Sequence, residues 1–124
     1  MAGLRRFKEL TAWQKAHELA LFVHKCTKRF PDEEKFGLTS QTRRAAVSIT
    51  SNIAEGFGRR TAQDKIHFYT MSKTSLAELQ NQFLIAYDLS YISGVINLEF
   101  ENRADGVERL IAGLIKSAAS KPSS

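Results

Sequence analysis

Residues 39–60, TSQTRRAAVSITSNIAEGFGRR, have a hydrophobic pattern with the period of a helix. At about 100° per residue, two neighbouring apolar rows cover about half of the helix circumference. Many side chains in this stretch are small, and small side chains let neighbouring backbones approach closely. We therefore expect a central helix that is packed on more than one side. The first row contains Thr42, Ala46, Ile49 and Ile53, and the second contains Val47, Thr50, Ala54 and Phe57.

A narrow polar strip remains on the other side of this helix, and the string SNIAEG lies on it. Asn52 and Glu55 belong to this strip. Asn52 lies close to Ser48, and Glu55 lies one turn before Arg59. Such a cluster can position a substrate, or it can be a structural network in which Glu55 pairs with Arg59. We favour the structural network and keep substrate positioning as the alternative.

Three other segments have helical periodicity, and short linkers join all four. Sequential helices joined in this way pack antiparallel. The sequence therefore predicts an all-α fold, an antiparallel up-down four-helix bundle that forms a single domain over residues 1–124. The helices are expected at residues 11–30, 38–58, 61–92 and 97–119, between a short basic N-terminal arm at residues 1–10 and a frayed C-terminal tail at residues 120–124.

Prolines, glycines and small polar residues mark the expected helix ends. Pro31 ends the first helix, and Thr39 or Ser40 caps the second. Gly56 and Gly58 close the second helix. Thr61 begins a capping box for the third helix, Ser93-Gly94 breaks the periodicity after it, and Asn97 caps the last helix.

The third helix carries two apolar rows on nearly opposite sides. One row can pack in the core of its own subunit. The other row needs a second partner, because a monomer rarely exposes a row of large apolar side chains. We therefore expect a homo-oligomer. The core row contains Tyr69, Ser72, Leu76, Leu79, Phe83 and Ala86, and the second row contains Met71, Ile85, Leu89 and Ile92.

The net charge of +5 is concentrated in the first half of the chain. Residues 1–60 contain 12 lysines and arginines against six acids, a net charge of +6, whereas residues 61–124 contain six against seven, a net charge of −1. This distribution favours an anionic partner. On composition alone, a solvated basic face that only aids solubility is the alternative.

Pairs of arginines lie at both ends of the central helix. Their composition suits contacts with phosphates, although no base-reading motif accompanies them. We predict that the nucleic-acid-binding residues are Arg43, Arg44, Arg59 and Arg60. The helical projection places Arg43 near the Val47 row, on the side where a neighbouring subunit would pack.

The chain has no glycine-rich phosphate loop, HExxH motif or GxSxG motif, so we expect no enzymatic activity and no cofactor. His17 and His24 share one side of the first helix but lie about 10.5 Å apart along its axis, too far to bind one metal ion. We expect them to be partly buried or at an interface, and we predict no metal site. His24 and Cys26 are two residues apart on a helix and point away from each other, so they do not form a catalytic pair.

Cys26 is the single cysteine, which excludes an internal disulfide and favours a reducing compartment. The apolar runs are far shorter than the ~20 residues that span a bilayer. We therefore predict a cytoplasmic protein without a membrane partner.

Three strings carry a family resemblance: FKELTAWQKAHELALFVHKCTKRFP, FGLTSQTRRAAVSITSNIAEGFGRR and SLAELQNQFLIAYDLSYIS. Their combination resembles the four-helix bundle proteins encoded in intervening sequences of bacterial 23S rRNA genes, and SNIAEGFGRR is the most distinctive part. That family is similar in turn to the accessory protein of diversity-generating retroelements, a basic pentameric barrel that binds nucleic acid and a reverse transcriptase. The resemblance implies a ring-forming bundle, with a homopentamer as the expected oligomer, and no enzymatic activity.

Two functions follow from these observations. The first is an oligomer that binds nucleic acid through a basic surface. Its ligand would be structured RNA, with rRNA as one candidate, and it would act on that RNA or on its processing. The alternative is a protein-interaction scaffold or an accessory subunit for a nucleic-acid enzyme such as a reverse transcriptase. Salt-dependent RNA binding would favour the first function, and co-purification of one protein partner without nucleic acid would favour the second.

Overall fold

The computed structural model describes residue 3 and residues 5–120. These residues form helices and turns and include no strand, which confirms the predicted all-α fold. Residues 121–124 of the predicted tail, and residues 1, 2 and 4 of the predicted arm, lie outside the described residues. The elements are η1 (Phe7–Glu9), α1 (Thr11–Thr27), η2 (Asp32–Glu34), α2 (Leu38–Phe57), α3 (Ala62–Asp88) and α4 (Gly94–Ser120), where η marks a short 3-10 turn.

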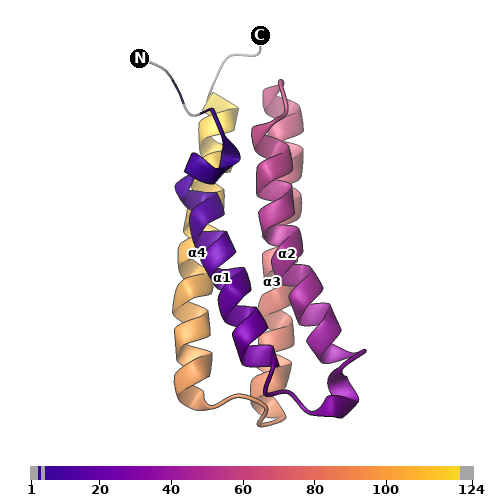
Figure 1. The fold of residues 1–124 in the computed structure, drawn as a ribbon. Coiled ribbons are helices and arrows are strands. Elements are labelled where there is room, and N and C mark those ends of the chain that lie inside the picture. The colour runs from indigo at the N-terminus through magenta and orange to yellow at the C-terminus, as the bar shows by residue number, and fades with distance from the viewer. Residues whose placement is uncertain (1–2, 4, 121–124) are drawn as a thin grey trace.

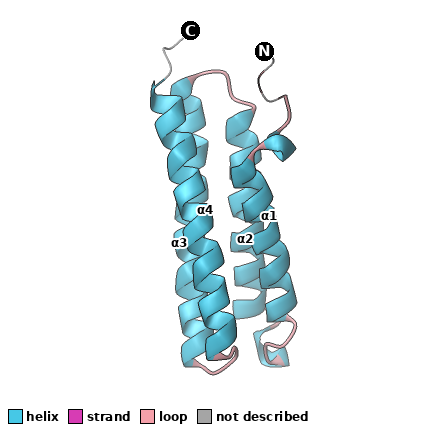
Figure 2. Ribbon diagram, turned by 90° about the vertical axis from the view of Figure 1, so that its left-hand side faces the viewer, coloured by secondary structure: helices cyan, strands magenta, loops and turns pink. Residues whose placement is uncertain are grey.

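The four long helices run up and down in one bundle (Figure 1). Each helix packs on the next one along the chain, and α1 also packs on α4. A view turned by 90° shows α3 and α4 beside α1 and α2 (Figure 2). The start of α1, the α2–α3 connection and the end of α4 therefore share one end of the bundle, the upper end in Figure 1. Turn η2 and the α3–α4 connection share the lower end.

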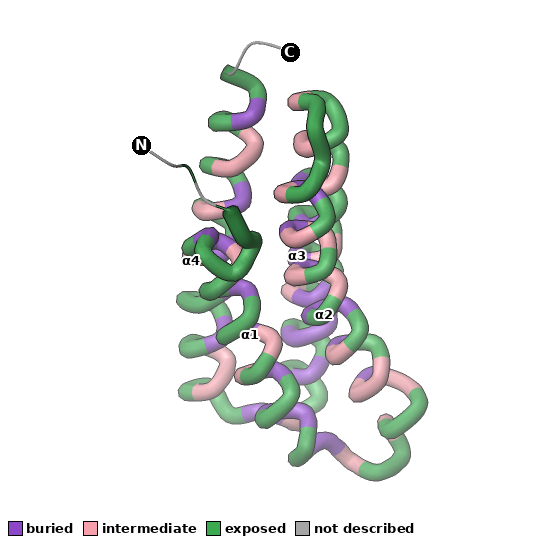
Figure 3. The backbone as a smooth tube through the Cα atoms, turned by 45° about the horizontal axis from the view of Figure 1, so that its top comes forward, coloured by how far each residue is buried: buried purple, intermediate pink, exposed green. Residues whose placement is uncertain are grey.

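The first predicted row of α2 and the predicted core row of α3 are buried inside this bundle (Figure 3), whereas the second row of α2 is half-buried and its Val47 is exposed. Ile49 and Ile53 of α2 are fully enclosed, and so are Leu79 and Phe83 of α3. Phe83 stacks on Phe100 of α4 with the ring centroids 3.9 Å apart, so the aromatic core joins α3 to α4. Helical periodicity alone was sufficient to identify these positions.

The ends of α1 and α2 differ from the predicted ones. Helix α1 ends at Thr27 instead of residue 30, because Pro31 forces the preceding residue out of the helical region and the last turn tightens into 3-10 bonds. Neither Thr39 nor Ser40 caps α2, which begins at Leu38 after Gly37. Its first free N–H, that of Leu38, donates to Glu34 Oε1 at 3.1 Å.

Only one of the two glycines predicted to close α2 does so. Gly58 is the C-terminal cap, whereas Gly56 lies inside the helix and is buried. Lys65 Nζ donates to the carbonyl of Phe57 at 2.7 Å and so satisfies one of the last carbonyls of α2. Thr61 caps α3 as predicted, since its side chain accepts a hydrogen bond from the N–H of Asp64 at 3.1 Å.

Helix α3 ends at Asp88 instead of residue 92, because Ser90 adopts a left-handed conformation with φ 65°. The N–H of Tyr91 donates to the carbonyl of Ala86 at 2.8 Å, and the N–H of Ser90 donates to that of Tyr87 at 2.9 Å. This pair of bonds is the Schellman motif, which more often has glycine at the left-handed position.

The early end of α3 also changes the start of α4 and one predicted apolar row. Helix α4 begins at Gly94, and Ser93 is its cap, because Ser93 Oγ accepts the N–H of Ile96 at 3.2 Å. Asn97 is therefore not the cap, and its side chain instead donates to Glu101 Oε1 at 2.8 Å. Ile92 is buried, whereas the other members of the predicted second row, Met71, Ile85 and Leu89, are exposed.

Candidate nucleic-acid interface

The four arginines predicted to bind nucleic acid lie at opposite ends of the bundle. Arg43 and Arg44 are in the second turn of α2, near the lower end, whereas Arg59 and Arg60 follow the last turn, at the upper end. Some fifteen residues separate the two pairs, which corresponds to about 20 Å along the helix axis. The fold therefore does not bring the four arginines together into one cluster.

Arg43 is half-buried and ties α2 to the end of α1. Its Nε donates to Thr27 Oγ1 at 2.7 Å, and its Nη2 donates to the carbonyl of His24 at 3.3 Å. A cation is also favourable at the carbonyl end of a helix. The contacts of Arg43 are thus internal, between two helices of one subunit.

Arg44 is exposed beside a cavity of about 360 Å³ that Ser48 and Glu78 also line. Its Nη2 donates to Ser40 Oγ at 3.0 Å. The carboxylate of Glu78 faces the same cavity, so an anion bound there would be attracted by Arg44 and repelled by Glu78.

Arg59 and Arg60 are both exposed at the upper end. Arg59 Nη2 lies 2.7 Å from Glu55 Oε2, which confirms the predicted pair one turn apart. The guanidinium of Arg59 also lies over the ring of Phe68, 4.4 Å from its centroid. These two contacts fix the orientation of Arg59 and leave its outer side open to solvent.

Ser48 joins the polar strip of α2 to α3 through a small hydrogen-bond network. Asn52 Nδ2 donates to the carbonyl of Ser48 at 2.9 Å and lies 3.1 Å from Ser48 Oγ. Ser48 Oγ in turn shares a hydrogen bond of 2.8 Å with Ser75 Oγ of α3. This geometry is that of the structural network that the sequence suggested.

The N-terminal arm adds basic residues to the upper end that are not among the predicted site residues. Glu9 Oε1 accepts the backbone N–H groups of Arg5 and Arg6 at 3.3 and 3.1 Å, which folds the arm into turn η1. Phe7 packs edge-on against Trp13 of α1, with the ring centroids 5.3 Å apart. Three of residues 5–8 are basic, and this density could have marked them as candidate phosphate-binding residues. Their position near the end of α2, however, follows only from the antiparallel fold.

The histidines and the cysteine do not form a reactive site. His17 and His24 are exposed within the subunit, so the predicted partial burial is wrong. The alternative, a position at a subunit interface, stays a prediction. His17 stacks on Trp13 at 4.7 Å between centroids. Cys26 is buried, and burial, followed by the nearby charge of Glu99, raises the pKa of its thiol. The thiol therefore stays protonated at neutral pH.

Two negative findings concern the part of the chain that the structure describes. No group of three or more His, Cys, Asp or Glu side chains is placed to hold a metal ion. In the same residues, no helix has both the length and the apolar character that a membrane crossing requires.

Comparisons with known proteins identify a family and a shared fold. The sequence model of the 23S rRNA-intervening sequence proteins matches residues 8–113. A solved structure from Bacteroides thetaiotaomicron, described as a protein with unknown function from the S23 ribosomal protein family, aligns with a TM-score of 0.78. Its sequence is 22% identical to this chain, and the alignment covers 85% of this chain and 95% of the other. The search among curated proteins found no match.

Proposed function

The chain belongs to the family of 23S rRNA-intervening sequence proteins, and from this premise we propose that it is a non-enzymatic oligomer that binds nucleic acid, above all structured RNA. Ribosomal RNA is the first RNA to test, because the family is named for its place in 23S rRNA genes. We also propose a cytoplasmic location, where such a protein would meet ribosomal RNA.

The position of the exposed cations at the upper end is the observation that supports this proposal most. Arg59 and Arg60 lie there, and the antiparallel arrangement brings the arm residues Arg5, Arg6 and Lys8 to the same end. We call these five residues the arginine end. Their guanidinium and ammonium groups can contact phosphates without reading bases, so the proposed binding has little sequence preference. Arg43 and Arg44 remain predictions, and the proposal does not depend on them.

The absence of catalysis is part of the proposal. Asn52 and Glu55, the polar residues that could have positioned a substrate, are engaged with Ser48 and Arg59. The Cys26 thiol is buried and protonated. These contacts favour a binding protein over an enzyme.

Self-association is the second part of the proposal. Met71, Ile85 and Leu89 of α3 are exposed, and so is Val47 of the second row of α2. Exposed large apolar side chains favour association, and a closed ring repeats the arginine end once per subunit. The number five comes from the family resemblance alone. Light scattering that gives a monomer at tens of micromolar protein would refute this part.

The RNA-binding proposal is tested by fluorescence anisotropy with a labelled RNA stem-loop and a duplex DNA of similar length. We expect both probes to bind, the RNA stem-loop at least as tightly as the duplex DNA, and the affinity for both to fall steeply between ~50 and ~200 mM salt, because phosphate contacts release counterions. Binding that is undetectable at ~50 mM salt, or an affinity that hardly changes with salt, would contradict the electrostatic proposal. Capture of a single protein partner without nucleic acid would then favour the scaffold alternative.

A further inference from the structure

Phe36 is the most exposed large apolar side chain in the described part of the protein, at 90% exposure. It follows η2 on the turn that projects from the lower end of the bundle beside α2 (Figure 1). Asp32 and Glu33 on the same turn are exposed and form no ion pair with the other described residues. We call residues 32–36 the acidic knob: its three acids outnumber its single cation, Lys35, whose Nζ lies 5.6 Å from the centroid of the Phe36 ring. A large apolar side chain is stabilised when a partner covers it, because its apolar surface is then removed from water.

Glu34 holds the acidic knob in a fixed conformation. Its Oε1 accepts the N–H of Leu38 at 3.1 Å, and its Oε2 accepts the hydroxyl of Tyr91 at 2.9 Å. Both carboxylate oxygens are therefore used to join the knob to α2 and to the α3–α4 connection. A surface that is already ordered loses less conformational entropy when it binds.

A groove follows the seam between α1 and α4. Its lower part has a volume of about 600 Å³, and an adjoining part has about 520 Å³. Glu18 and Arg103 line both parts, so the two form one continuous groove. The apolar lining of the lower part includes Phe22, Ile96 and Leu21, and Leu21 is 59% exposed.

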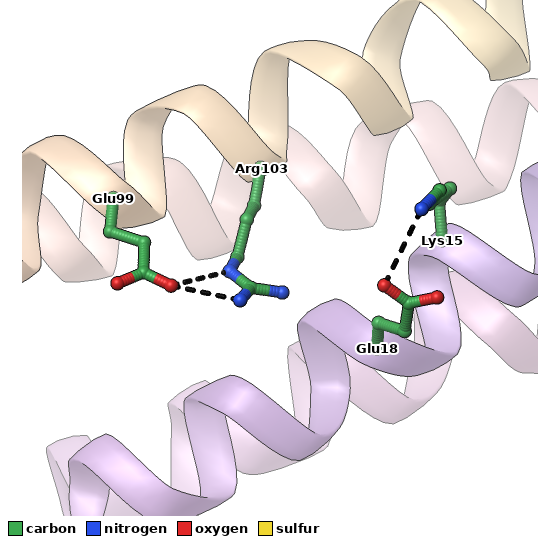
Figure 4. A network of polar contacts seen from close by, with 4 residues as sticks. All are labelled: Lys15, Glu18, Glu99 and Arg103. Atoms are coloured by element: carbon green, nitrogen blue, oxygen red, sulfur yellow. Dashed lines mark hydrogen bonds and ion pairs between the residues drawn. The ribbon is translucent and has the colours of Figure 1, made fainter.

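The charges on the rim of the lower part of this groove leave two cations unpaired. Each acid on the rim pairs within its own helix, as Figure 4 shows: Glu18 with Lys15 at 3.6 Å and Glu99 with Arg103 at 2.8 Å. Lys25 and Arg29 line the lower part and have no ion pair within residues 5–120. The lower groove therefore fits a segment that offers an apolar side chain together with carboxylates.

We propose that the acidic knob of one copy of this chain docks into the lower α1–α4 groove of the next copy. This inference rests on the proposed self-association and assigns its head-to-tail contact to two surfaces separate from the exposed row on α3. Phe36 packs against the apolar lining, and the two free acids of the knob face the two free cations of the rim. Phe36 contacts Leu21 and Ile96, at the edge of the Phe22 ring, over which the Arg103 guanidinium lies at 4.8 Å from the centroid. Asp32 and Glu33 contact Lys25 and Arg29.

The positions of the two surfaces agree with such a contact. The last turns of α1 and the first turns of α4 line the lower groove, and the knob directly follows α1, so both lie at the lower end of the bundle. The knob projects beside α2, whereas α4 lies on the other side of α1 (Figure 1). The contact is therefore head-to-tail between two different surfaces. A rotation axis parallel to the helices would join them into a closed ring.

Two single variants and one control test the contact by sedimentation velocity. Phe36→Ser removes the aromatic side chain of the knob, and Leu21→Glu places a carboxylate in the groove. Both residues are exposed, so the helical circular dichroism should not change. We expect each variant to weaken self-association by at least about thirtyfold, the loss typical of a central aromatic contact. Ala77→Glu, which adds the same charge at an exposed position of α3, should keep the wild-type oligomer.

Mixing the two variants gives the sharper test. Leu21→Glu retains an intact knob, and Phe36→Ser retains an intact groove, so one intact contact can form between them. In the resulting dimer, the unused surfaces are the altered knob of Phe36→Ser and the altered groove of Leu21→Glu. Neither can bind a third subunit through this contact. A 1:1 mixture should therefore contain dimers and nothing larger.

The outcomes separate this inference from the proposed function. If the wild-type protein is an oligomer and both variants keep its size, the knob–groove contact is wrong while self-association stands. If the variants dissociate but their mixture forms no dimer, the contact is not head-to-tail and the inference is likewise wrong. A monomeric wild-type protein would overturn the proposed self-association and this inference with it, and it would leave the RNA-binding measurement unaffected.

Discussion

The ring of Tyr69 on α3 lies against the backbone of Gly56 on α2, so close that a Cβ atom built on Gly56 would be 2.7 Å from Tyr69 Cε1. One turn away, Ser72 Oγ donates to the carbonyl of Ile49 at 2.8 Å, also between α3 and α2. The two helices approach each other closely here because Gly56 has no side chain and Ser72 has a short polar one.

Replacing Gly56 by alanine should therefore destabilise the protein. Alanine is the better helix former, but its methyl group would force Tyr69 and α3 outward, and overpacking of this kind costs about 1–3 kcal/mol. Gly113→Ala is the matched control, since nothing lies within 4 Å of a Cβ built there, and it should stabilise α4 by about 0.5–1 kcal/mol. Chemical denaturation measures both changes. Equal effects of the two substitutions would show that Gly56 is not a packing site.

Ser90 is the second position where backbone geometry predicts a stability change. Its φ of 65° is costly for a side chain with a Cβ atom, and glycine removes that cost. Ser90→Gly should raise the free energy of unfolding by about 0.5–1 kcal/mol, and Ser90→Val should lower it, because a β-branched residue tolerates this conformation poorly. Thermal unfolding followed by circular dichroism checks the order of the three proteins. A valine variant as stable as the glycine variant would contradict it.

Gly56 and Ser90 also show which parts of the fold could not be predicted from the sequence. The burial of Ile49 and Phe83 follows from helical periodicity, which repeats over many turns and tolerates local error. The role of Gly56 does not follow from periodicity, because a glycine near a helix end looks like a cap until the path of α3 is known. Ser90 was missed for a related reason: the left-handed position is usually glycine, and the chain has a glycine four residues later.

The candidate site was harder to predict than the fold. Arg43 and Arg59 look alike in sequence, as arginines near the ends of one helix. Only tertiary contacts distinguish them, because the partners of Arg43 are sixteen and nineteen residues away on α1, whereas Arg59 meets Glu55 within one turn. The acidic knob and its groove are also separated along the chain, and no local pattern relates them.

Gln82 provides a test of a buried polar group. It is buried, its Nε2 donates to Glu78 Oε2 at 3.3 Å, and its Oε1 has no hydrogen-bond partner among the described residues. An unsatisfied buried acceptor is costly, whereas an apolar side chain of the same shape is not. Gln82→Met should therefore raise the free energy of unfolding by up to about 1 kcal/mol. Denaturant titration checks this. A clear loss of stability would mean that the amide has a partner that the described contacts lack.

The bond between Tyr91 and Glu34 predicts a dependence on alkaline pH. The hydrogen bond to the Glu34 carboxylate, together with burial and the nearby negative charges, raises the pKa of the Tyr91 hydroxyl. A raised folded-state pKa means that the stabilisation is complete below the pKa of a free tyrosine, about 10, and is lost as the pH rises through the folded-state pKa. The wild-type protein should therefore lose its stability advantage over Tyr91→Phe above pH ~10. Denaturation of both proteins between pH ~8 and ~11 measures the difference, and a constant difference would contradict the prediction.

The arginine end gives the last prediction, which compares Arg59→Ala/Arg60→Ala with Arg43→Ala. The double variant should bind RNA and DNA of any sequence more weakly. Its plot of log affinity against log salt should be flatter by about 0.7 per lost phosphate contact on single strands and about 0.9 on duplex DNA. Its stability should change little, because the pair of Arg59 with Glu55 is exposed and such pairs contribute at most about 1 kcal/mol.

Arg43→Ala should show the opposite behaviour. Removing the bonds to Thr27 and to the carbonyl of His24 should cost about 1–2 kcal/mol of stability, while the folded variant should bind RNA with the wild-type salt slope. Anisotropy titrations at several salt concentrations, paired with denaturation of the same samples, separate the two effects. If Arg43→Ala flattens the salt slope and the double variant does not, the phosphates are bound near the lower end of α2, and the arginine end is not the interface.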